Sequence, residues 1–220
     1  MKRPHEADAP RLERDLRTLA ELDLSSHFEL HDSIVNNVPV SGEGRGGRIQ
    51  GCELRDLGFG GRGLGGLTAT DVLMVRVDLS AADLSRASLT RVRFVDCRLL
   101  GANLAEATLT GVAFENCTLE LSNLRYGRLA RVKFERCALE KVDFAHAQLA
   151  DVRFVGSRLE GADLRGAKLD AVDLCGSHLR GLQGLASLRG ATIDTGQLVE
   201  LAPDLAADLG ISVQDRGAGS

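Results

Sequence analysis

The sequence contains no tryptophan, a single tyrosine and seven phenylalanines among its 220 residues. A hydrophobic core must therefore consist mainly of leucine, valine and alanine, a composition that suits a fold of many small repeated units. The sequence also lacks any run of about 18 apolar residues, the length that a membrane-spanning helix needs. Its first residues contain no apolar stretch typical of a secretion signal, so we expect a cytoplasmic protein.

The cysteines and histidines do not form a recognisable site. The cysteines are odd in number and lack CxxC spacing, which favours reduced thiols over a disulfide framework or a zinc site; they are Cys52, Cys97, Cys117, Cys137 and Cys175. His146 and His178 fall on different sides of the repeat described below, so no metal-ligating set is predicted. Because no catalytic triad, converging carboxylates or cofactor fingerprint occurs either, we expect neither an enzyme nor a bound cofactor.

The sequence does contain a five-residue repeat. From Val77 to Leu179 a Leu or Phe stands at every fifth position, and a small or β-branched residue precedes each by two positions. A period of five fits neither a helix nor a single strand when it continues along most of the chain, so the chain must turn every five residues. Both repeated residues are predicted to point inward. The core residues predicted in this way include Leu84, Phe94, Cys97, Leu104, Phe114, Cys117, Leu124, Phe134, Cys137 and Phe154.

The repeat also shows how many sides make one coil. Equivalent residues recur at intervals of 20, as in the series Phe94, Phe114, Phe134 and Phe154. Stacked coils place equivalent residues in columns, so each coil has four sides, and neighbouring coils form a parallel ladder about 4.8 Å apart. Parallel connections are nearly always right-handed. The predicted fold is an all-β solenoid, a right-handed quadrilateral parallel β-helix with 20-residue coils, capped by a short N-terminal helix and by C-terminal helices.

Several repeats match a known signature. The triplets Ala82-Asp83-Leu84, Ala102-Asn103-Leu104 and Ala162-Asp163-Leu164 spell A(D/N)LXX, and the region from about Ile49 to Leu182 resembles the pentapeptide-repeat family. The best-understood members of that family resemble a DNA duplex in outline, bind type II topoisomerases and protect DNA gyrase from quinolones or natural poisons. The resemblance therefore implies DNA gyrase or topoisomerase IV as a partner, without direct contact with nucleic acid or membrane.

The chain departs from the quinolone-protecting members of enterobacteria in one respect. Those members carry loops that bulge from the coil, whereas residues 77–181 here contain none. A coil without loops is more similar to the mycobacterial members. The Gly-rich segment from Ser41 to Arg48 is the only candidate projecting loop; a phosphate-binding role is a weaker alternative, because the segment has no GK[ST].

We divide the chain into five parts. A helix from Ala9 to Leu22 is predicted because Leu12, Leu16 and Leu19 have helical spacing. Arg62 occupies a position that should point inward, which indicates distorted first coils. The predicted parts are an N-terminal helical cap (1–24), irregular Gly-rich first coils (25–70), the regular repeat (71–182), a C-terminal helical cap or dimerisation segment (183–213) and a disordered tail (214–220).

The C-terminal segment is predicted to cover the open end of the solenoid. Asp194 or Thr195 would cap a helix there, and Pro203 would divide it into two short helices. The segment resembles the tail through which gyrase-protecting members form homodimers. Its apolar residues are the predicted dimer contact, with a simple monomeric cap as the alternative; they are Leu198, Leu201, Leu205 and Leu209.

The outward charges do not resemble those of DNA. Residues 71–181 hold 16 basic and 15 acidic residues, so the coil is nearly neutral. Glu120, Glu140 and Glu160 form one acidic column, and a basic column of Arg93, Lys133 and Arg153 lies on the neighbouring side. We interpret the glutamates either as a partner contact or as a solvated face paired with the basic residues. Mimicry of duplex shape is compatible with these counts, and strong mimicry of duplex charge is not.

A small apolar patch is predicted on the outside of the coil. Leu100, Leu121 and Tyr126 occupy outward positions, with Arg125 beside them, and this composition is typical of a protein contact. Two functions follow. The first is a DNA-mimicking protein that binds gyrase and gives resistance to its poisons; the second is a non-catalytic scaffold that binds another protein through an outward face.

Overall fold

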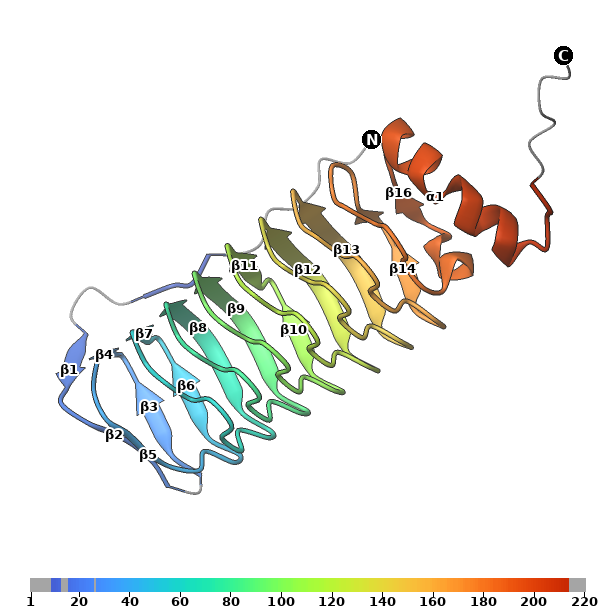
Figure 1. Cartoon of the computed structure of the whole chain (residues 1–220). Coiled ribbons are helices and arrows are strands. Elements are labelled where there is room, and N and C mark those ends of the chain that lie inside the picture. The colour runs from blue at the N-terminus through green and yellow to red at the C-terminus, as the bar shows by residue number, and fades with distance from the viewer. Residues whose placement is uncertain (1–8, 13–15, 26, 214–220) are drawn as a thin grey trace, which may run out of the picture.

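The structure, a computed structural model, describes residues 9–12, 16–25 and 27–213. The chain forms a parallel β-solenoid of about nine turns, closed at its C-terminal end by a single α-helix (Figure 1). The all-β solenoid predicted from the five-residue repeat is confirmed. Residues 1–8 of the predicted N-terminal helical cap and the predicted disordered tail (214–220) lie outside the described residues.

Short parallel strands make up the walls of the solenoid. Fourteen strands belong to one sheet and two, β2 and β5, to a second. The strands are β1 (Arg17–Leu19), β2 (Leu22–Leu24), β3 (Glu29–His31), β4 (Ser33–Asn36), β5 (Val40–Gly42), β6 (Arg48–Gln50), β7 (Glu53–Arg55), β8 (Thr68–Val75), β9 (Ser88–Val95), β10 (Thr108–Thr110), β11 (Ala113–Glu115), β12 (Arg128–Glu135), β13 (Gln148–Val155), β14 (Lys168–Asp170), β15 (Val172–Asp173) and β16 (Ala191–Thr192).

The regular coils have a constant length. Strand β8 places Thr68 opposite Ser88 of β9, and β12 places Arg128 opposite Gln148 of β13, so equivalent residues recur at intervals of 20. Isolated bridges repeat this register on the other sides. The backbone turns at every fifth residue through a positive φ angle; in the coil of residues 108–127 the corners are Gly111, Asn116, Leu121 and Tyr126. The four sides of this coil are therefore residues 108–112, 113–117, 118–122 and 123–127.

Identical side chains stack inside the regular coils. The rings of Phe94 and Phe114 lie 4.7 Å apart and nearly parallel, and Phe134 and Phe154 continue the stack at spacings of 4.9 and 5.0 Å. Phe144 meets the stack edge-on. All ten core residues that the repeat predicts are buried. The interior is narrow, so each large inward residue must lie beside a small one. This requirement explains why a small or β-branched residue accompanies each Leu or Phe of the repeat.

The first coils are shorter than the regular ones. Strand β1 pairs with β4 through Arg17 and Ser33, and β2 pairs with β5 through Leu22 and Val40. Both pairs are closer in sequence than the residues that pair in the regular coils. Strand β6 then pairs with β8 in the regular register. The shorter coils therefore lie before Arg48, whereas the coil that contains Arg62 already has the regular register, with Gly63 opposite Asp83.

The predicted N-terminal helix is wrong. Arg17–Leu19 and Leu22–Leu24 are strands, and residues 13–15 of that prediction lie outside the described residues. Leu22 and Leu24 are buried. The core that they complete outweighs the helical spacing of the preceding leucines, because tertiary contacts override local preference.

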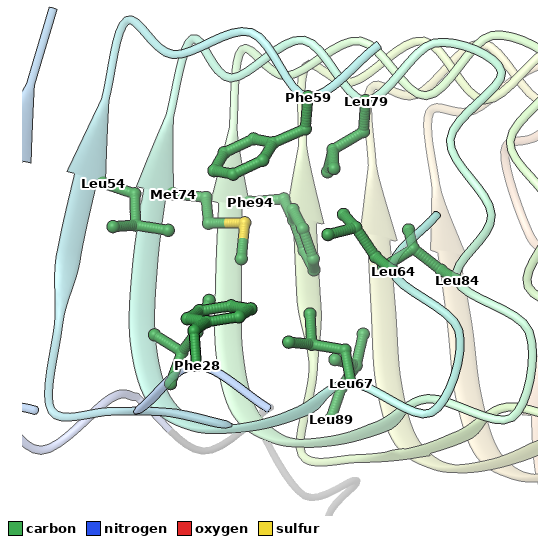
Figure 2. Close-up of a pocket in the computed structure, with 11 residues that line it drawn as sticks. Phe28, Leu54, Phe59, Leu64, Leu67, Met74, Leu79, Leu84, Leu89 and Phe94 are labelled. Atoms are coloured by element: carbon green, nitrogen blue, oxygen red, sulfur yellow. The ribbon is translucent and has the colours of Figure 1, made fainter. Parts of the chain in front are cut away.

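The Gly-rich segment forms part of the wall and does not project as a loop. Gly44 and Gly47 are buried, and the Phe28 ring fills the space beside them. A Cβ atom on Gly47 would lie 2.0 Å from Cε1 of Phe28, so no larger residue fits there. Figure 2 shows Phe28 pointing into the interior beside Leu54 and Met74. The glycines therefore make room for an aromatic ring that fills the first coils.

Arg62 supports the distorted wall from an inward position of the repeat. Its guanidinium donates hydrogen bonds to the carbonyl oxygens of Val40 and Gly42, both at 2.6 Å. The side chain is half-buried, in the column that holds the buried Ala82 in the next coil. The inward position thus accepts an arginine because backbone carbonyls of strand β5 satisfy its donors.

The C-terminal end is closed by a 3-10 helix, Leu185–Leu188, and by helix α1, Thr195–Asp208. Asp194 caps α1 in a reciprocal pair of hydrogen bonds with Gln197. The predicted break at Pro203 is wrong, because α1 continues through it. Leu201 and Leu205, on either side of Pro203 along the helix, pack against the core, and this contact compensates for the hydrogen bond that proline removes.

Candidate functional site

A column of Asp and Asn side chains stabilises the turns of the coil through hydrogen bonds. Asp83 accepts a hydrogen bond from the backbone N–H of Ser85 at 3.0 Å and another from the Asn103 amide at 3.0 Å. Asn123 donates in turn to Asn103 at 3.1 Å. Burial alone would raise the pKa of Asp83, but hydrogen bonds from Ser85 and Asn103 outweigh it and hold the pKa below its ordinary value. These groups are satisfied within the chain and offer nothing to a partner.

The three glutamates lie in one column, as the register requires, and they differ in their contacts. Glu140 accepts a hydrogen bond from Arg158 at 2.5 Å. Glu120 and Glu160 have no ion pair in the described part of the chain. One carboxylate oxygen each of Glu140 and Glu160 is shielded from solvent and has no hydrogen-bond partner among the described residues. The column therefore presents a short, partly neutralised acidic stripe.

The basic column is bound to acidic neighbours on the same side. Arg93 forms a bidentate pair with Glu115 at 2.7 and 2.8 Å, and Lys133 lies 2.6 Å from Glu135. Arg153, the third member, also has a contact within the chain. Glu115 and Glu135 thus neutralise the positive charges of Arg93 and Lys133, so this side does not form a strongly charged surface.

The predicted apolar contact lies on one edge of the solenoid. Leu121 is 60% exposed, Tyr126 is 56% exposed and Leu100 is 43% exposed. Leu100 shares the column of the glutamates, and Leu121 follows at the adjacent corner. Tyr126 lies at the next corner, across the side of residues 123–127. We call Leu121, Arg125 and Tyr126 the Tyr126 ridge.

Aromatic stacking orders the ridge. The Tyr126 ring stacks on the His146 imidazole at 5.1 Å with an interplanar angle of 6°, and the Arg125 guanidinium lies 5.6 Å from the centre of the tyrosine ring. Arg125 also pairs with Asp143 at 3.1 Å. Gly166 leaves room for the imidazole, since a Cβ there would lie 2.5 Å from its Nδ1. The sequence analysis missed this stack, although the 20-residue interval between Tyr126 and His146 signals it.

Helix α1 carries two different faces. Leu201 is completely buried and Leu205 is partly buried against the last coil, whereas Leu198 is 50% and Leu209 75% exposed. Val199, which the sequence analysis did not single out, is 70% exposed. Two of the four predicted dimer contacts therefore belong to the cap. The surface left for a partner comprises Leu198, Val199 and Leu209.

Four of the cysteines and the cavity of the first coils are enclosed in the solenoid, whereas Cys175 is exposed. Cys97, Cys117 and Cys137 are buried in one column, where the Cys137 thiol and burial raise the pKa of Cys117 to about 12. Such thiols are poor nucleophiles. A cavity of about 10 Å³ in the first coils is lined only by apolar side chains, so it has no group to hold a polar ligand (Figure 2).

Within residues 9–12, 16–25 and 27–213, no group of three or more His, Cys, Asp or Glu residues is arranged to hold a metal ion. The same ranges contain no helix that is long and apolar enough to cross a membrane.

The chain is similar to several solved structures, at low sequence identity. QnrB1, described as a plasmid-mediated fluoroquinolone resistance protein, is 19% identical over 88% of this chain and 100% of its own, with a TM-score of 0.31. HetL from Nostoc, involved in heterocyst differentiation regulation, is 21% identical over 78% of this chain and 91% of its own, with a TM-score of 0.28. A thylakoid-lumen protein of Arabidopsis thaliana is 16% identical over 67% of this chain and 75% of its own, with a TM-score of 0.18.

Sequence comparisons place the same region in one family. A search among curated proteins finds no match. Two family models match, one for a pentapeptide repeat region at residues 67–135 and one for eight pentapeptide repeats at residues 143–181. Both matches coincide with the coils of constant register. The chain therefore belongs to the pentapeptide-repeat family.

Proposed function

We propose that the protein binds a type II topoisomerase, DNA gyrase in the first place, and protects it from poisons. The observation that carries the proposal is the unbroken wall of regular coils from Thr68 to Leu182, which projects no loop and gives a rod of constant cross-section. A rod of this kind can occupy a surface that normally receives a DNA duplex. In this proposal the protein acts by binding the topoisomerase and has no catalytic role.

The mimicry would be of shape more than of charge. Duplex DNA carries one negative charge per about 1.7 Å of its axis, whereas the Glu120 column has one carboxylate per coil and Arg158 neutralises Glu140. The basic column is paired with Glu115 and Glu135. A topoisomerase surface would therefore recognise the rod mainly through its outline, with the glutamates as a minor electrostatic contribution.

A homodimer through α1 would double the length of the rod. Leu198, Val199 and Leu209 form an exposed apolar surface beside the face that caps the coil. Helix α1 places Glu200 and Asp204, two of its three acidic residues, on the other side of the capping face, because successive residues turn by about 100°. The apolar surfaces of two helices could thus meet without opposing these carboxylates.

The test is a gyrase supercoiling and cleavage assay with purified protein, with and without a quinolone. Restored supercoiling, or fewer trapped cleavage complexes, at low-micromolar protein would support the proposal; no effect on gyrase or topoisomerase IV would reject it. A Leu198→Asp, Val199→Asp variant tests the dimer, with mass measured by light scattering. A Glu120→Gln, Glu140→Gln, Glu160→Gln variant tests the electrostatic part and is expected to retain most of the protection.

A second candidate is a scaffold that binds an unrelated protein. The Tyr126 ridge favours it, because a solvent-exposed leucine and tyrosine contribute nothing to the solenoid core. A wild-type protein without effect on topoisomerases, but with a binding partner that requires the ridge, would establish this function in place of the first.

A further inference from the structure

We propose that residues 5–8 continue the N-terminal segment as an extended strap along one corner of the solenoid, so that a partner reaches this corner only by displacing the strap. The inference does not depend on the identity of the partner and stands apart from the topoisomerase proposal. We call the corner the Asp71 corner; it is the column of Asp71, Arg91, Gly111, Arg131 and Asp151.

The Asp71 corner is less exposed than the other three corners of the solenoid. Asp71 and Gly111 are buried, and the other three members of the column are half-buried. At the other three corners every residue from position 56 to position 181 is exposed, apart from the half-buried Gly161. Part of the chain therefore covers the Asp71 corner as far as Asp151.

The arginines of the column do not account for this burial. Gly111 lies between two of them, but the Arg91 guanidinium points away from it and donates to the Asp71 carboxylate at 2.6 and 2.7 Å. Gly156, next to Arg136 in another corner column, is exposed, so one neighbouring arginine does not bury a corner glycine. A further segment must therefore lie over Gly111.

The N-terminal segment runs along this corner toward the C-terminal end of the solenoid. The backbone N–H of Arg17 donates to the carbonyl oxygen of Asp32 at 2.9 Å, and the backbone N–H of Arg11 donates to Oδ1 of Asp71 at 3.0 Å. Asp32 lies at the same corner in an earlier coil than Asp71. Figure 1 shows residues 9–12 running along the stack of coils. The chain before Arg11 therefore continues toward the later coils.

The length of the segment fits the covered stretch. An extended residue spans about 3.3 Å, so residue 5 lies about 20 Å beyond Arg11. Neighbouring coils are about 4.8 Å apart, which places residue 5 at the level of Asp151. Ala171, the corner residue of the following coil, is exposed. The cover thus ends where residues 5–8 would end.

An alternation in burial indicates which side chains of the segment face the solenoid. Pro10 and Leu12 are half-buried, whereas Ala9 and Arg11 are exposed. Successive side chains of an extended chain point to opposite sides, so the even-numbered residues face the wall.

The same alternation directs two carboxylates, those of Asp8 and Glu6, toward the wall. Asp8 lies about 10 Å from Arg11 along the corner, at the level of Gly111, and Glu6 lies about 7 Å farther. Arg131 stands between these two levels and is half-buried, whereas the arginines at the other corners are exposed. A half-buried guanidinium requires acceptors, and carboxylates are the strongest that a chain offers. The charges therefore favour residues 5–8 as the cover.

The strap would make one corner of the rod accessible only on displacement. A partner that contacts the Asp71 corner has to replace residues 5–8, whereas the other three corners are open to contact. The Arg11 amide keeps the displaced strap attached at Asp71. The strap is thus an autoinhibitory contact confined to one corner.

The first test measures the distance between spin labels at His5→Cys and Thr18→Cys in the full-length protein. A Cys175→Ser background is used, because the other four cysteines are buried. A bound strap places the two labels on opposite sides of Arg11 along the corner, so we expect a narrow distribution at about 35 Å. A broad distribution at shorter distances would overturn the proposal.

Charge reversal tests the contact with Arg131. Arg131→Glu should broaden the distance distribution, and adding Glu6→Lys and Asp8→Lys should restore the narrow one. Arg86→Glu, at an exposed position of another corner, is the matched control and should leave the distribution unchanged. A narrow distribution in Arg131→Glu, or no recovery with the two lysines, would reject the strap.

The rate of thiol modification shows whether the strap covers the wall. Thr110→Cys, at a half-buried position next to Gly111, should react with a maleimide several times faster when Glu6→Lys and Asp8→Lys are added. Thr108→Cys, at an exposed position of the same strand, should react equally in both backgrounds. Equal rates at Thr110→Cys would show that other residues bury this corner. Both measurements use the free protein, so their outcome is distinguishable from that of the gyrase assay.

Discussion

The first coils and the regular coils fill the interior of the solenoid in different ways. From Thr68 to Gln183 paired residues recur at a constant interval of 20, and inward residues stack on copies of themselves, as Phe94 does on Phe114. Before Thr68 the strand pairs β1–β4, β2–β5 and β3–β6 each have a different and shorter offset. There Phe28 lies against two glycines, and Arg62 binds carbonyl oxygens of a neighbouring coil.

The difference shows what a constant coil length provides. With equal coils, the backbone hydrogen bonds and the inward side chains repeat together, so one set of residues serves every coil. When a coil loses residues, its wall shifts relative to the next, and individual residues must fill or bridge the mismatch. The first coils should therefore depend on specific pairs of residues, and the regular coils on size and polarity alone.

The largest effect should come from a charge in the regular core. Leu109 is completely buried, so Leu109→Lys places an unpaired charge in an apolar interior and should cost about 3–5 kcal/mol or prevent folding. Circular dichroism during thermal unfolding measures the loss. Thr108→Lys, at the adjacent exposed position, is the control and should leave the Tm nearly unchanged; a stable Leu109→Lys protein would contradict the inward assignment.

A specific pair should control the first coils. Gly47→Ala brings a Cβ against the Phe28 ring and should destabilise the protein by about 1–3 kcal/mol. Adding Phe28→Leu should recover part of this loss, which a double-mutant cycle from urea unfolding would measure. Gly58→Ala is the control, because nothing lies within 4 Å of the added carbon. Equal losses at Gly47 and Gly58 would argue against the Phe28 contact.

The bridging arginine should have a smaller effect. Arg62→Met keeps the apolar stem and removes the hydrogen bonds to Val40 and Gly42, with an expected cost of about 1–2 kcal/mol. Amide hydrogen exchange should increase in strand β5 and remain unchanged in β12. Arg45→Met, in a side chain that is 74% exposed, serves as the control. Uniform changes along the whole chain would show that Arg62 acts globally and does not bridge two coils.

The smallest effect concerns pH and the N-terminal segment. A bidentate pair with Arg91 lowers the pKa of Asp71, and the backbone N–H of Arg11 also donates to its carboxylate at 3.0 Å. Ionised Asp71 stabilises the fold above its ordinary pKa, and this contribution is lost as the pH falls through the lower pKa of the folded state. The Tm of Asp71→Asn should therefore depend less on pH below about pH 4 than that of the wild type.

Hydrogen exchange completes this test. The Asp71→Asn change should also increase exchange at the Arg11 amide, because its acceptor becomes neutral. Asp170→Asn, at an exposed position, provides the control for the pH series. If both substitutions change the pH dependence equally, Asp71 has no special contribution.

The outward residues show where sequence reasoning reached its limit. The five-residue repeat places Leu121, Arg125 and Tyr126 outside the coil, and the structure finds Leu121 and Tyr126 exposed. The leucine pattern of α1 does not distinguish its faces, because only contact with the last coil separates Leu198 from Leu201. The sequence also does not reveal which carboxylate reaches which arginine, since those pairs depend on side-chain reach between coils.

By itself, the sequence determined the solenoid, the 20-residue coil, the four sides and the residues of the core. These follow from a strictly local rule, because each five-residue unit must bury the same two positions and turn in the same way. Only the tertiary structure decided which secondary structure the two ends of the solenoid adopt. At these ends the repeat stops, so long-range contacts determine the structure in place of periodicity. Leu22 and Leu24 lie in a strand and are buried in the core, although the leucines before them have helical spacing. Helix α1 continues through Pro203 because Leu201 and Leu205 pack against the last coil.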